Sequence, residues 1–501
     1  MSFEQQISGI RVSMPMTRRE INSDISEDFT IPDYCPEIRK VLCVWECLLT
    51  PAKFISGSKV DVSGVIDYTL VYVGSDGALC SAPMSGEYSF SLPLENMADF
   101  EISEGLTVMA NSVCDTSSVR VSAPRRLQIR SRLRTFVSVW GKKLCGETLM
   151  GLDEENLPMR LCETSECADI ICESSDVITI TDDYTLPSSD WRIGMALGNV
   201  SVGDTHVEGE VLKIEGEAII RILLVNDAEG KTEKVIRRLP FEGESDLDGI
   251  ELSDDTLSRA SGNITDLTIN VEEGTAHIEA NLVLEVCSAV NSPVTYATDV
   301  YSTAQCCETE HCNVTLPLML ENKNTSFSQN ERIPLVDCAV PEDAEPIDIS
   351  AWASIDSVAF ENGRCVLRGT CRYSVICKRD DEYLSSEIKM PMRYECDFDS
   401  KSNPVNVDGT ATANAVRVKK DGEDLCIDCE LELSYSVWGE HVVDMLERAE
   451  FGEPVDKQKG RIVVCYPSPE DTAWSIAKRY HVSQDEIEGD PLSDPFVIIE
   501  L

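Results

Sequence analysis

The chain has 501 residues, 42% of them hydrophobic, which is enough for three or four domains that each bury a core. Its 89 acidic residues against 43 basic ones give a formal net charge of -46. Because such a surface repels phosphate groups, the charge disfavours binding to nucleic acid and to anionic lipid. No apolar run is long enough to cross a membrane and no leader peptide follows Met1, so the sequence predicts a cytoplasmic protein without a transmembrane segment.

A strand-like pattern occurs three times along the chain, after a short helix that is expected within residues 33–47. In residues 60–72, 212–224 and 365–377 every second residue is apolar, which predicts a strand with one buried and one solvated face. The third inward position of each copy is a glycine, namely Gly64, Gly216 and Gly369. A glycine inside a strand indicates a bulge or a close approach of another backbone.

Other markers repeat with these strands. The first and third copies both close on the tetrapeptide Ser-Val-Trp-Gly, at residues 138–141 and 436–439. A second short helix is expected at 442–450. The pattern predicts a mainly β protein whose antiparallel repeat domains are sandwiches or barrels. The predicted repeat domains are residues 1–150, 151–310 and 311–455. A chain that repeats one β unit is typical of proteins that present contact surfaces rather than a reaction centre.

Four arginines break the acidic pattern in the strand that leads to the first tetrapeptide. They are Arg126, Arg130, Arg132 and Arg134, which occupy alternate positions and so line one face of that strand. This face is either a docking strip for an acidic partner, or a solvated face whose guanidinium groups pair with neighbouring carboxylates. Both interpretations stay open at this point.

The 21 cysteines are irregularly spaced, which does not suggest a disulfide framework. Cys365, Cys371 and Cys377 occupy inward positions of the third repeated strand, so we expect buried thiols that act as small apolar side chains. Two groups have spacings that zinc could use: Cys426 with Cys429, and a cluster between the second and third units formed by Cys306, Cys307, His311 and Cys312. Free thiols are the prediction for both groups, and a zinc-dependent structural protein is the alternative.

The five histidines lie in no recognisable catalytic motif. The sequence therefore predicts a protein that is not an enzyme, with no catalytic residues and no cofactor.

The last 42 residues have a different character. Ile462–Tyr466 is a predicted strand, and Asp471 or Thr472 can cap a helix that runs to Tyr480. Ser483-Gln484-Asp485-Glu486 is a capping box for a second short helix, and residues 496–499 end the chain as a strand. The predicted order is strand, helix, helix, strand.

This terminal segment, residues 460–501, resembles the LysM module, with a degenerate motif. Asp471-Thr472 and Ile476-Ala477 match the LysM pattern, Asp490-Pro491 stands where an Asn-Pro is usual, and Glu470 replaces a glycine. The three larger units resemble the SPOCS-type repeat, a domain of unknown function of sporulating Firmicutes. A chain that combines the two resembles the clostridial spore-coat morphogenetic proteins that bind the coat-basement ATPase.

The resemblance implies a non-enzymatic protein of spore-coat assembly, located in the mother cell at the forespore surface. Its terminal module would dock a coat morphogenetic ATPase, and its repeats would contact other coat proteins or each other. The alternative function is binding of peptidoglycan or N-acetylglucosamine oligomers through the same module.

Either partner or glycan would contact the two loops that form the LysM groove, with Glu470 favouring protein recognition because it narrows and charges the groove. Trp474 could be an exposed anchor for a partner or could pack inside the chain. The candidate binding residues are Pro469, Glu470, Asp471, Thr472, Ala473, Trp474, Gly489, Asp490, Pro491 and Leu492.

Overall fold

The computed structural model describes residues 6–101, 105–152, 158–175, 177–245, 252–253, 255–361, 364–397, 404–456 and 460–500. These residues are mainly antiparallel β structure, with a single α-helix among them, which confirms the predicted mainly β class. No helix in the described part of the chain has the length and apolar character needed to span a membrane.

The strands fall into three consecutive groups. The first group contains β1 (Gln6–Thr30), β2 (Ile38–Leu48), β3 (Ala52–Ser56), β4 (Lys59–Gly74), β5 (Leu79–Pro93), the 3₁₀ turn η1 (Met97–Asp99), β6 (Leu106–Ala123) and β7 (Arg126–Met150). The second contains β8 (Met159–Ser174), β9 (Ile178–Thr185), β10 (Arg192–Glu208), β11 (Val211–Asn226), β12 (Lys231–Ser245), β13 (Leu257–Glu272) and β14 (Thr275–Tyr301). The third contains β15 (Gln305–Pro334), β16 (Glu345–Glu361), β17 (Arg364–Arg379), β18 (Glu382–Asp397), β19 (Pro404–Asp421) and β20 (Asp424–Pro454).

The three groups have the same pairing order. The repeated strands β4, β11 and β17 each pair with the strand before and the strand after them, so the predicted strands are confirmed. Opposite each of these sheets lies a second layer of strands, in which β7 pairs with β1 and β6, β14 with β8, β9 and β13, and β20 with β15 and β19. The layers of the first and third groups belong to one six-stranded sheet. Each pair of sheets encloses its own apolar core. The domain boundaries stay a prediction, and β15 runs through residue 310.

The repeated glycines lie where another residue comes very close. A Cβ on Gly64 would lie 2.4 Å from the ring of Tyr88, and one on Gly216 would lie 2.5 Å from the ring of Phe241. On Gly369 it would lie 2.6 Å from the side chain of Met392. In each group the large apolar residue is directly opposite the glycine on the following strand. The predicted close backbone approach is confirmed at Gly216 and Gly369, where a Cβ would also lie 2.4 Å from the Ser201 carbonyl oxygen and 2.0 Å from that of Ser354, whereas at Gly64 the close neighbour is a side chain.

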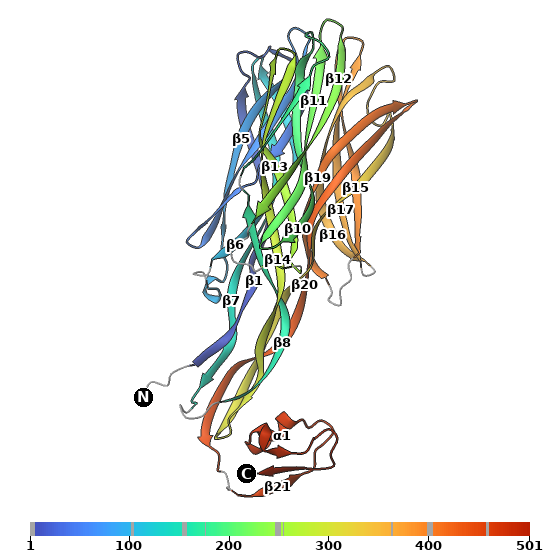
Figure 1. Ribbon diagram of the computed structural model, residues 1–501. Coiled ribbons are helices and arrows are strands. Elements are labelled where there is room, and N and C mark those ends of the chain that lie inside the picture. The colour runs from blue at the N-terminus through green and yellow to red at the C-terminus, as the bar shows by residue number, and fades with distance from the viewer. Residues whose placement is uncertain are drawn as a thin grey trace.

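Long strands from all three groups continue below the paired sheets as a narrow stalk, which Figure 1 shows as a tapering bundle. We call the described residues within 16–140, 170–290 and 319–439 the body, and the stalk is residues 6–15, 141–150, 159–169, 291–301, 305–318 and 440–454. Two apolar clusters run along the stalk interior. At its lower part β20 pairs in parallel with β7, over Arg448–Glu450 and Thr148–Met150.

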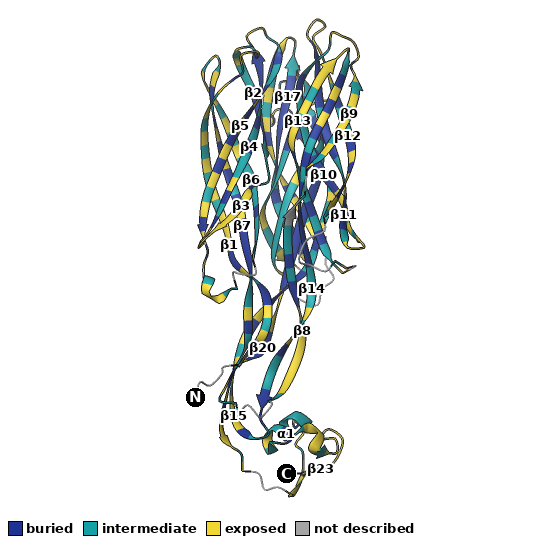
Figure 2. Cartoon of the chain, turned by 60° about the vertical axis from the view of Figure 1, so that its left-hand side comes forward, coloured by how far each residue is buried: buried dark blue, intermediate teal, exposed yellow. Residues whose placement is uncertain are grey.

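Figure 2 shows buried and exposed segments alternating along the strands of the body.

The groups also pack against each other. One apolar cluster takes Leu42 and Trp45 from the first group, Leu197 from the second and Ile376 from the third. The tryptophans of the repeated tetrapeptide, Trp140 and Trp438, stack on each other with ring centroids 4.5 Å apart. The two copies of this motif thus form one contact between the first and third groups.

Beyond the stalk lies the terminal domain, residues 460–500. It contains β21 (Ile462–Cys465), α1 (Ala473–Tyr480), the 3₁₀ turn η3 (Gln484–Glu486), β22 (Ile487–Glu488) and β23 (Val497–Glu500), with the strands in the order β21-β23-β22. The first predicted helix and both predicted strands are present. The second predicted helix is wrong, because residues 484–486 form a single 3₁₀ turn and Ile487 already pairs with Ile499.

Two other predicted helices are wrong. Residues 38–48 form β2, which pairs with β4, and residues 442–450 lie within β20, which pairs with β15. In both cases the chain lies beside a long strand whose backbone groups it satisfies, so tertiary pairing outweighs local preference. The three cysteines of the third repeated strand are buried, as predicted, and none of them is more than 1% exposed.

Candidate functional site

The first predicted binding loop is built around Asp471, just before α1. Its carboxylate accepts a hydrogen bond from the backbone N–H of Ser468 at 2.9 Å and forms an ion pair with Arg479, one helix length away. The Arg479 guanidinium, with the Ser468 N–H, lowers the pKa of Asp471 to about 2. Asp471 is therefore committed to holding the loop on the helix, while Pro469 and Glu470 are exposed.

Thr472 begins the helix. Its Oγ1 accepts a hydrogen bond from the backbone N–H of Ser475 at 3.1 Å, and the Ser475 Oγ accepts one from the Thr472 N–H at 2.9 Å. This reciprocal capping box satisfies backbone donors that the first turn leaves free. Thr472 is the cap that the sequence offered as one of two choices, and Ala473 is the first helical residue.

Trp474 packs against the chain's own stalk. Its Nε1–H donates to Asp299 Oδ2 at 2.7 Å, and its ring meets Tyr301 edge-on with centroids 4.9 Å apart. Lys478 pairs with the same carboxylate, and the Tyr301 hydroxyl donates to the carbonyl of Val482 at 2.7 Å. Burial opposes the ionised form of Asp299, but the hydrogen bonds from Lys478 and Trp474 lower its pKa overall. The structure therefore supports the interpretation in which Trp474 packs inside the chain rather than serving as an exposed anchor.

The second predicted loop is a separate turn. Gly489 has φ +104°, a conformation that side chains with a Cβ rarely adopt. The carboxylate of Asp490 accepts hydrogen bonds from the Leu492 N–H at 3.0 Å and the Ser493 hydroxyl at 2.8 Å, and these lower its pKa. Pro491 is half-buried and Leu492 is exposed. Each predicted loop is thus closed by hydrogen bonds of its own.

The terminal sheet has an apolar outer face that sequence reasoning missed. Its inner residues Cys465, Val497 and Ile499 pack under α1. On the other side Ile462 is 65% exposed and Tyr466 is 75% exposed. The outer face is formed by Ile462, Val464, Tyr466, Phe496 and Ile498. The available signal was that residues 462–466 are all apolar, so both faces of the predicted strand are apolar.

This outer face lies on the side away from the stalk. Figure 1 shows α1 toward the strands of the stalk and β21 on the far side. The rings of Tyr466 and Phe496 meet edge-on with centroids 6.3 Å apart. Glu488 and Glu500 are exposed beside these residues. The face is therefore an apolar strip with an acidic border.

Two of the four predicted surface arginines form ion pairs within the chain. Arg132 pairs with Asp24 at 3.1 Å, and Arg134 pairs with Asp115 and Asp356 at 3.0 Å each. Arg134 joins the first group to the third, and only 12% of its side chain is exposed. For Arg132 and Arg134 the structure therefore supports the interpretation in which the guanidinium groups pair with neighbouring carboxylates. Arg126 and Arg130 lie on the same strand.

The cysteine groups of the two zinc hypotheses lie on strands. Cys306, Cys307, His311 and Cys312 are part of β15, and Cys426 and Cys429 are part of β20. Residues three apart on a strand point to opposite faces, which separates Cys426 from Cys429. Within the described ranges no three histidine, cysteine or acidic side chains come together as a metal site.

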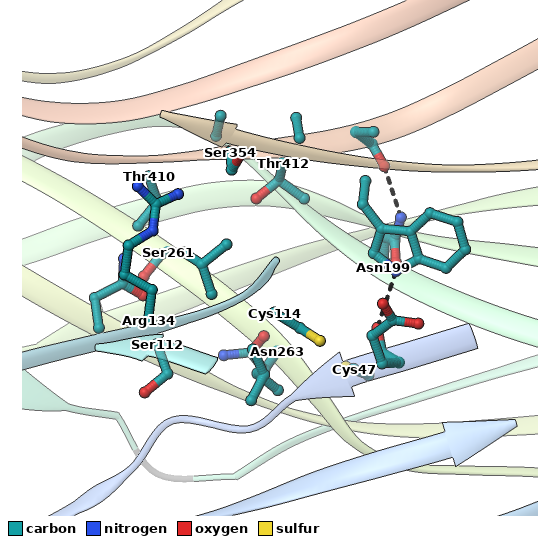
Figure 3. Close-up of a pocket in the computed structure, with 18 of the residues that line it drawn as sticks. Cys47, Ser112, Cys114, Arg134, Asn199, Ser261, Asn263, Ser354, Thr410 and Thr412 are labelled. Atoms are coloured by element: carbon teal, nitrogen blue, oxygen red, sulfur yellow. Dashed lines mark hydrogen bonds between the residues drawn. The ribbon is translucent and has the colours of Figure 1, made fainter. Parts of the chain in front are cut away.

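A cavity of about 670 Å³ lies where the three groups meet. Neighbouring strands of all three groups line it, chiefly β2, β6, β10, β13, β16 and β19, and Figure 3 shows their side chains around it. Of the repeated strands, β17 contributes Thr370 and Arg372 to the described lining. Sequence reasoning missed this cavity because its walls come from segments far apart in the chain.

Two charged groups of this cavity have partners from another group of strands. Glu432, 6% exposed, accepts hydrogen bonds from the Ser201 hydroxyl at 2.7 Å and the Val202 N–H at 3.1 Å, which joins β20 to β10. Burial raises the pKa of Glu432 despite these donors. Arg372 forms a buried ion pair with Glu46. These contacts connect the three groups around the cavity, and we call this contact region the central joint.

The thiols of the cavity are poor nucleophiles. Burial raises the pKa of Cys47 to about 12 and that of Cys114 to about 11, so both are protonated at neutral pH. None of the five histidines is among the described residues that line the cavity.

The chain was compared with known proteins on three levels. No family model, no curated protein and no solved structure matches it.

Proposed function

We propose that this chain is a non-enzymatic interaction protein whose terminal domain captures a protein partner. The single observation that carries this proposal is the apolar outer face of the terminal sheet, exposed at the far end of a long stalk. Contiguous apolar residues on a surface mark interaction sites, and aromatic residues contribute much of the binding energy at such sites. Tyr466 and Phe496 provide two aromatic rings there.

The partner class follows from the resemblance of the sequence and from charge. The resemblance suggests a coat morphogenetic ATPase at the forespore surface, with the body contacting other coat proteins. The acidic border at Glu488 and Glu500 suits an apolar segment flanked by lysine or arginine. A second copy of this chain would bring the same acidic border and would be repelled.

The predicted loop residues support protein binding better than glycan binding. Asp471 and Thr472 are engaged in the loop and the helix cap, and Glu470 is exposed where LysM modules have glycine. Glycan recognition through these loops therefore competes with contacts that the domain uses for its own structure.

A pull-down with the purified coat ATPase tests this function. The full chain should be retained, and both Val464→Glu and removal of residues 456–501 should reduce retention at least about tenfold, because a buried charge costs several kcal/mol at an interface. Val442→Glu is the matched control, since Val442 is a similarly exposed valine of the stalk. Retention of Val464→Glu at the level of this control would contradict docking through the outer face.

A second pull-down on insoluble peptidoglycan separates the glycan alternative. Retention of the full chain that is lost in Thr472→Ala but kept in Val464→Glu would favour glycan binding over the proposal.

A further inference from the structure

Two cysteines lie directly opposite each other in the second group. Cys172 of β8 pairs with Cys287 of β14 in the antiparallel ladder. Directly opposed residues of such a ladder have Cα atoms about 4.5–5.5 Å apart and side chains on the same face. A disulfide needs a Cα separation of about 4.4–6.8 Å. The backbone therefore already has the geometry for a cross-strand disulfide, while both residues are free thiols in this structure.

This pair lines a cavity. Cys172, Cys287, Met109 and Arg259 are among the residues around a space of about 390 Å³ beside the central joint. The Cys287 Sγ lies 3.8 Å from the Met109 Sδ. A small oxidant that enters this space reaches both thiols.

The surroundings also shift the pKa values of the two thiols in opposite directions. The hydrogen bond from Cys172 lowers the pKa of Cys287, and the Arg259 guanidinium lowers it further, although burial opposes this. Burial raises the pKa of Cys172. Since the thiolate is the reactive form, Cys287 is the thiol that attacks and Cys172 is the thiol that closes the bond.

The chain contains its own control for access. Cys365 and Cys396 are directly opposed in the same way, on β17 and β18. They belong to the core of the third group and are 0% and 2% exposed. Neither is among the described residues that line the central joint or the cavity around Cys287. The two pairs share the pairing geometry and differ in the cavity.

We propose that Cys172 and Cys287 form a peroxide-responsive site that closes a disulfide between β8 and β14. The Cys287 thiolate attacks one oxygen of the peroxide, the O–O bond breaks, and the Cys287 sulfenic acid forms with release of hydroxide, which takes up the thiol proton as water. The Cys172 sulfur then attacks the Cys287 sulfur, and the hydroxyl group leaves with the Cys172 proton as a second water. Two thiols and one hydrogen peroxide thus give one disulfide and two waters.

The bond would connect β8 to β14 at the point where the stalk enters the body. It fixes the register of these strands, so the oxidised chain should resist unfolding of the second group more than the reduced chain. This inference is independent of the proposed function of the terminal domain.

Thiol mapping of the full chain tests the proposal. The reduced protein is treated with equimolar hydrogen peroxide, free thiols are alkylated, and the digested peptides are analysed by mass spectrometry. The Cys172–Cys287 cross-linked peptide should form at least about tenfold faster than the Cys365–Cys396 peptide. Oxidation of the exposed Cys162 and Cys306 serves as an internal measure of the oxidant.

A variant traps the intermediate. In Cys172→Ser the Cys287 sulfenic acid should persist and react with dimedone, whereas Cys365→Ser should leave the cross-link unchanged. Equal rates for the two pairs, or oxidation of Cys162 without any Cys172–Cys287 cross-link in the folded wild-type chain, would overturn the proposal. The wild-type result alone decides this if Cys172→Ser does not fold.

Discussion

The contacts between the groups of the body and the outer face of the terminal domain use different kinds of side chain. In the body, charged side chains are turned inward between the groups, where Glu432, Arg372 and Arg134 find partners from another group. In the terminal domain, apolar side chains are turned outward on the outer face, while Trp474, Lys478 and the Val482 carbonyl attach the domain to the stalk. The charged side chains between the groups therefore have their partners within the chain, whereas the outer face has none among the described residues.

The inward charges of the body give the largest expected effect. Asp348 of β16 is 1% exposed, and its carboxylate lies 3.1 Å from the Lys234 Nζ and 3.9 Å from the Arg221 guanidinium of the second group. Asp348→Ala should lower the free energy of unfolding by about 3–5 kcal/mol, because two cations whose side chains are only 20% and 11% exposed lose their acid. Denaturant unfolding followed by circular dichroism measures this.

The control for this prediction is Asp343→Ala. Asp343 is 69% exposed at 4.0 Å from Arg379, and exposed pairs contribute at most about 1 kcal/mol. Similar losses of stability for the two variants would show that burial of an ion pair between the groups adds nothing to the stability of the chain.

The second effect concerns the packing of the repeated strands. Gly216→Ala would place a Cβ 2.4 Å from the Ser201 carbonyl oxygen and 2.5 Å from the Phe241 ring. The free energy of unfolding should fall by about 1–3 kcal/mol, because the core must shift to accept the methyl group. Gly452→Ala, where the added Cβ meets nothing within 4 Å, should be close to neutral or stabilising. Thermal unfolding of both variants tests the difference.

The third prediction is a pH dependence. Because burial raises the pKa of Glu432 in the folded state above its value in the unfolded chain, its stabilising contribution is full at pH below the unfolded pKa and falls as pH rises through the folded pKa. Glu432→Gln removes this titration, so wild-type stability relative to the variant should decrease from pH 4 toward neutral pH. Unfolding midpoints at several pH values measure the trend.

Glu430→Gln is the matched change on the same strand, at a side chain that is 41% exposed. If the difference in free energy of unfolding between wild type and Glu432→Gln does not change with pH, burial between the groups does not raise the pKa of Glu432.

The smallest effect is expected on the outer face of the terminal domain. Val464→Glu should change the stability of this domain by less than about 0.5 kcal/mol, because the side chain is exposed. Val497→Glu, at a fully buried position of the next strand, should unfold the domain. Hydrogen exchange of the backbone amides in residues 460–500 distinguishes these outcomes. Strong destabilisation by Val464→Glu would mean that the outer face packs within the chain.

Local patterns predicted much of this structure. The alternation in residues 60–72, 212–224 and 365–377, the glycine within each copy and the Thr472 cap are all present as expected. These features depend on a residue's immediate neighbours along the chain and on the period of a strand, so they can be read without knowing what lies opposite. The same holds for the buried cysteines at Cys365, Cys371 and Cys377.

Contacts between distant segments were decided by the tertiary structure alone. Pairing with β4 and β15 made strands of residues 38–48 and 442–450, and the arrival of Asp299 and Tyr301 beside Trp474 decided the role of that indole. The central cavity, the stacked Trp140 and Trp438 and the opposed Cys172 and Cys287 likewise join segments far apart in the chain. A strand's period determines which side chains share a face, but only the assembly of the three groups determines what that face meets.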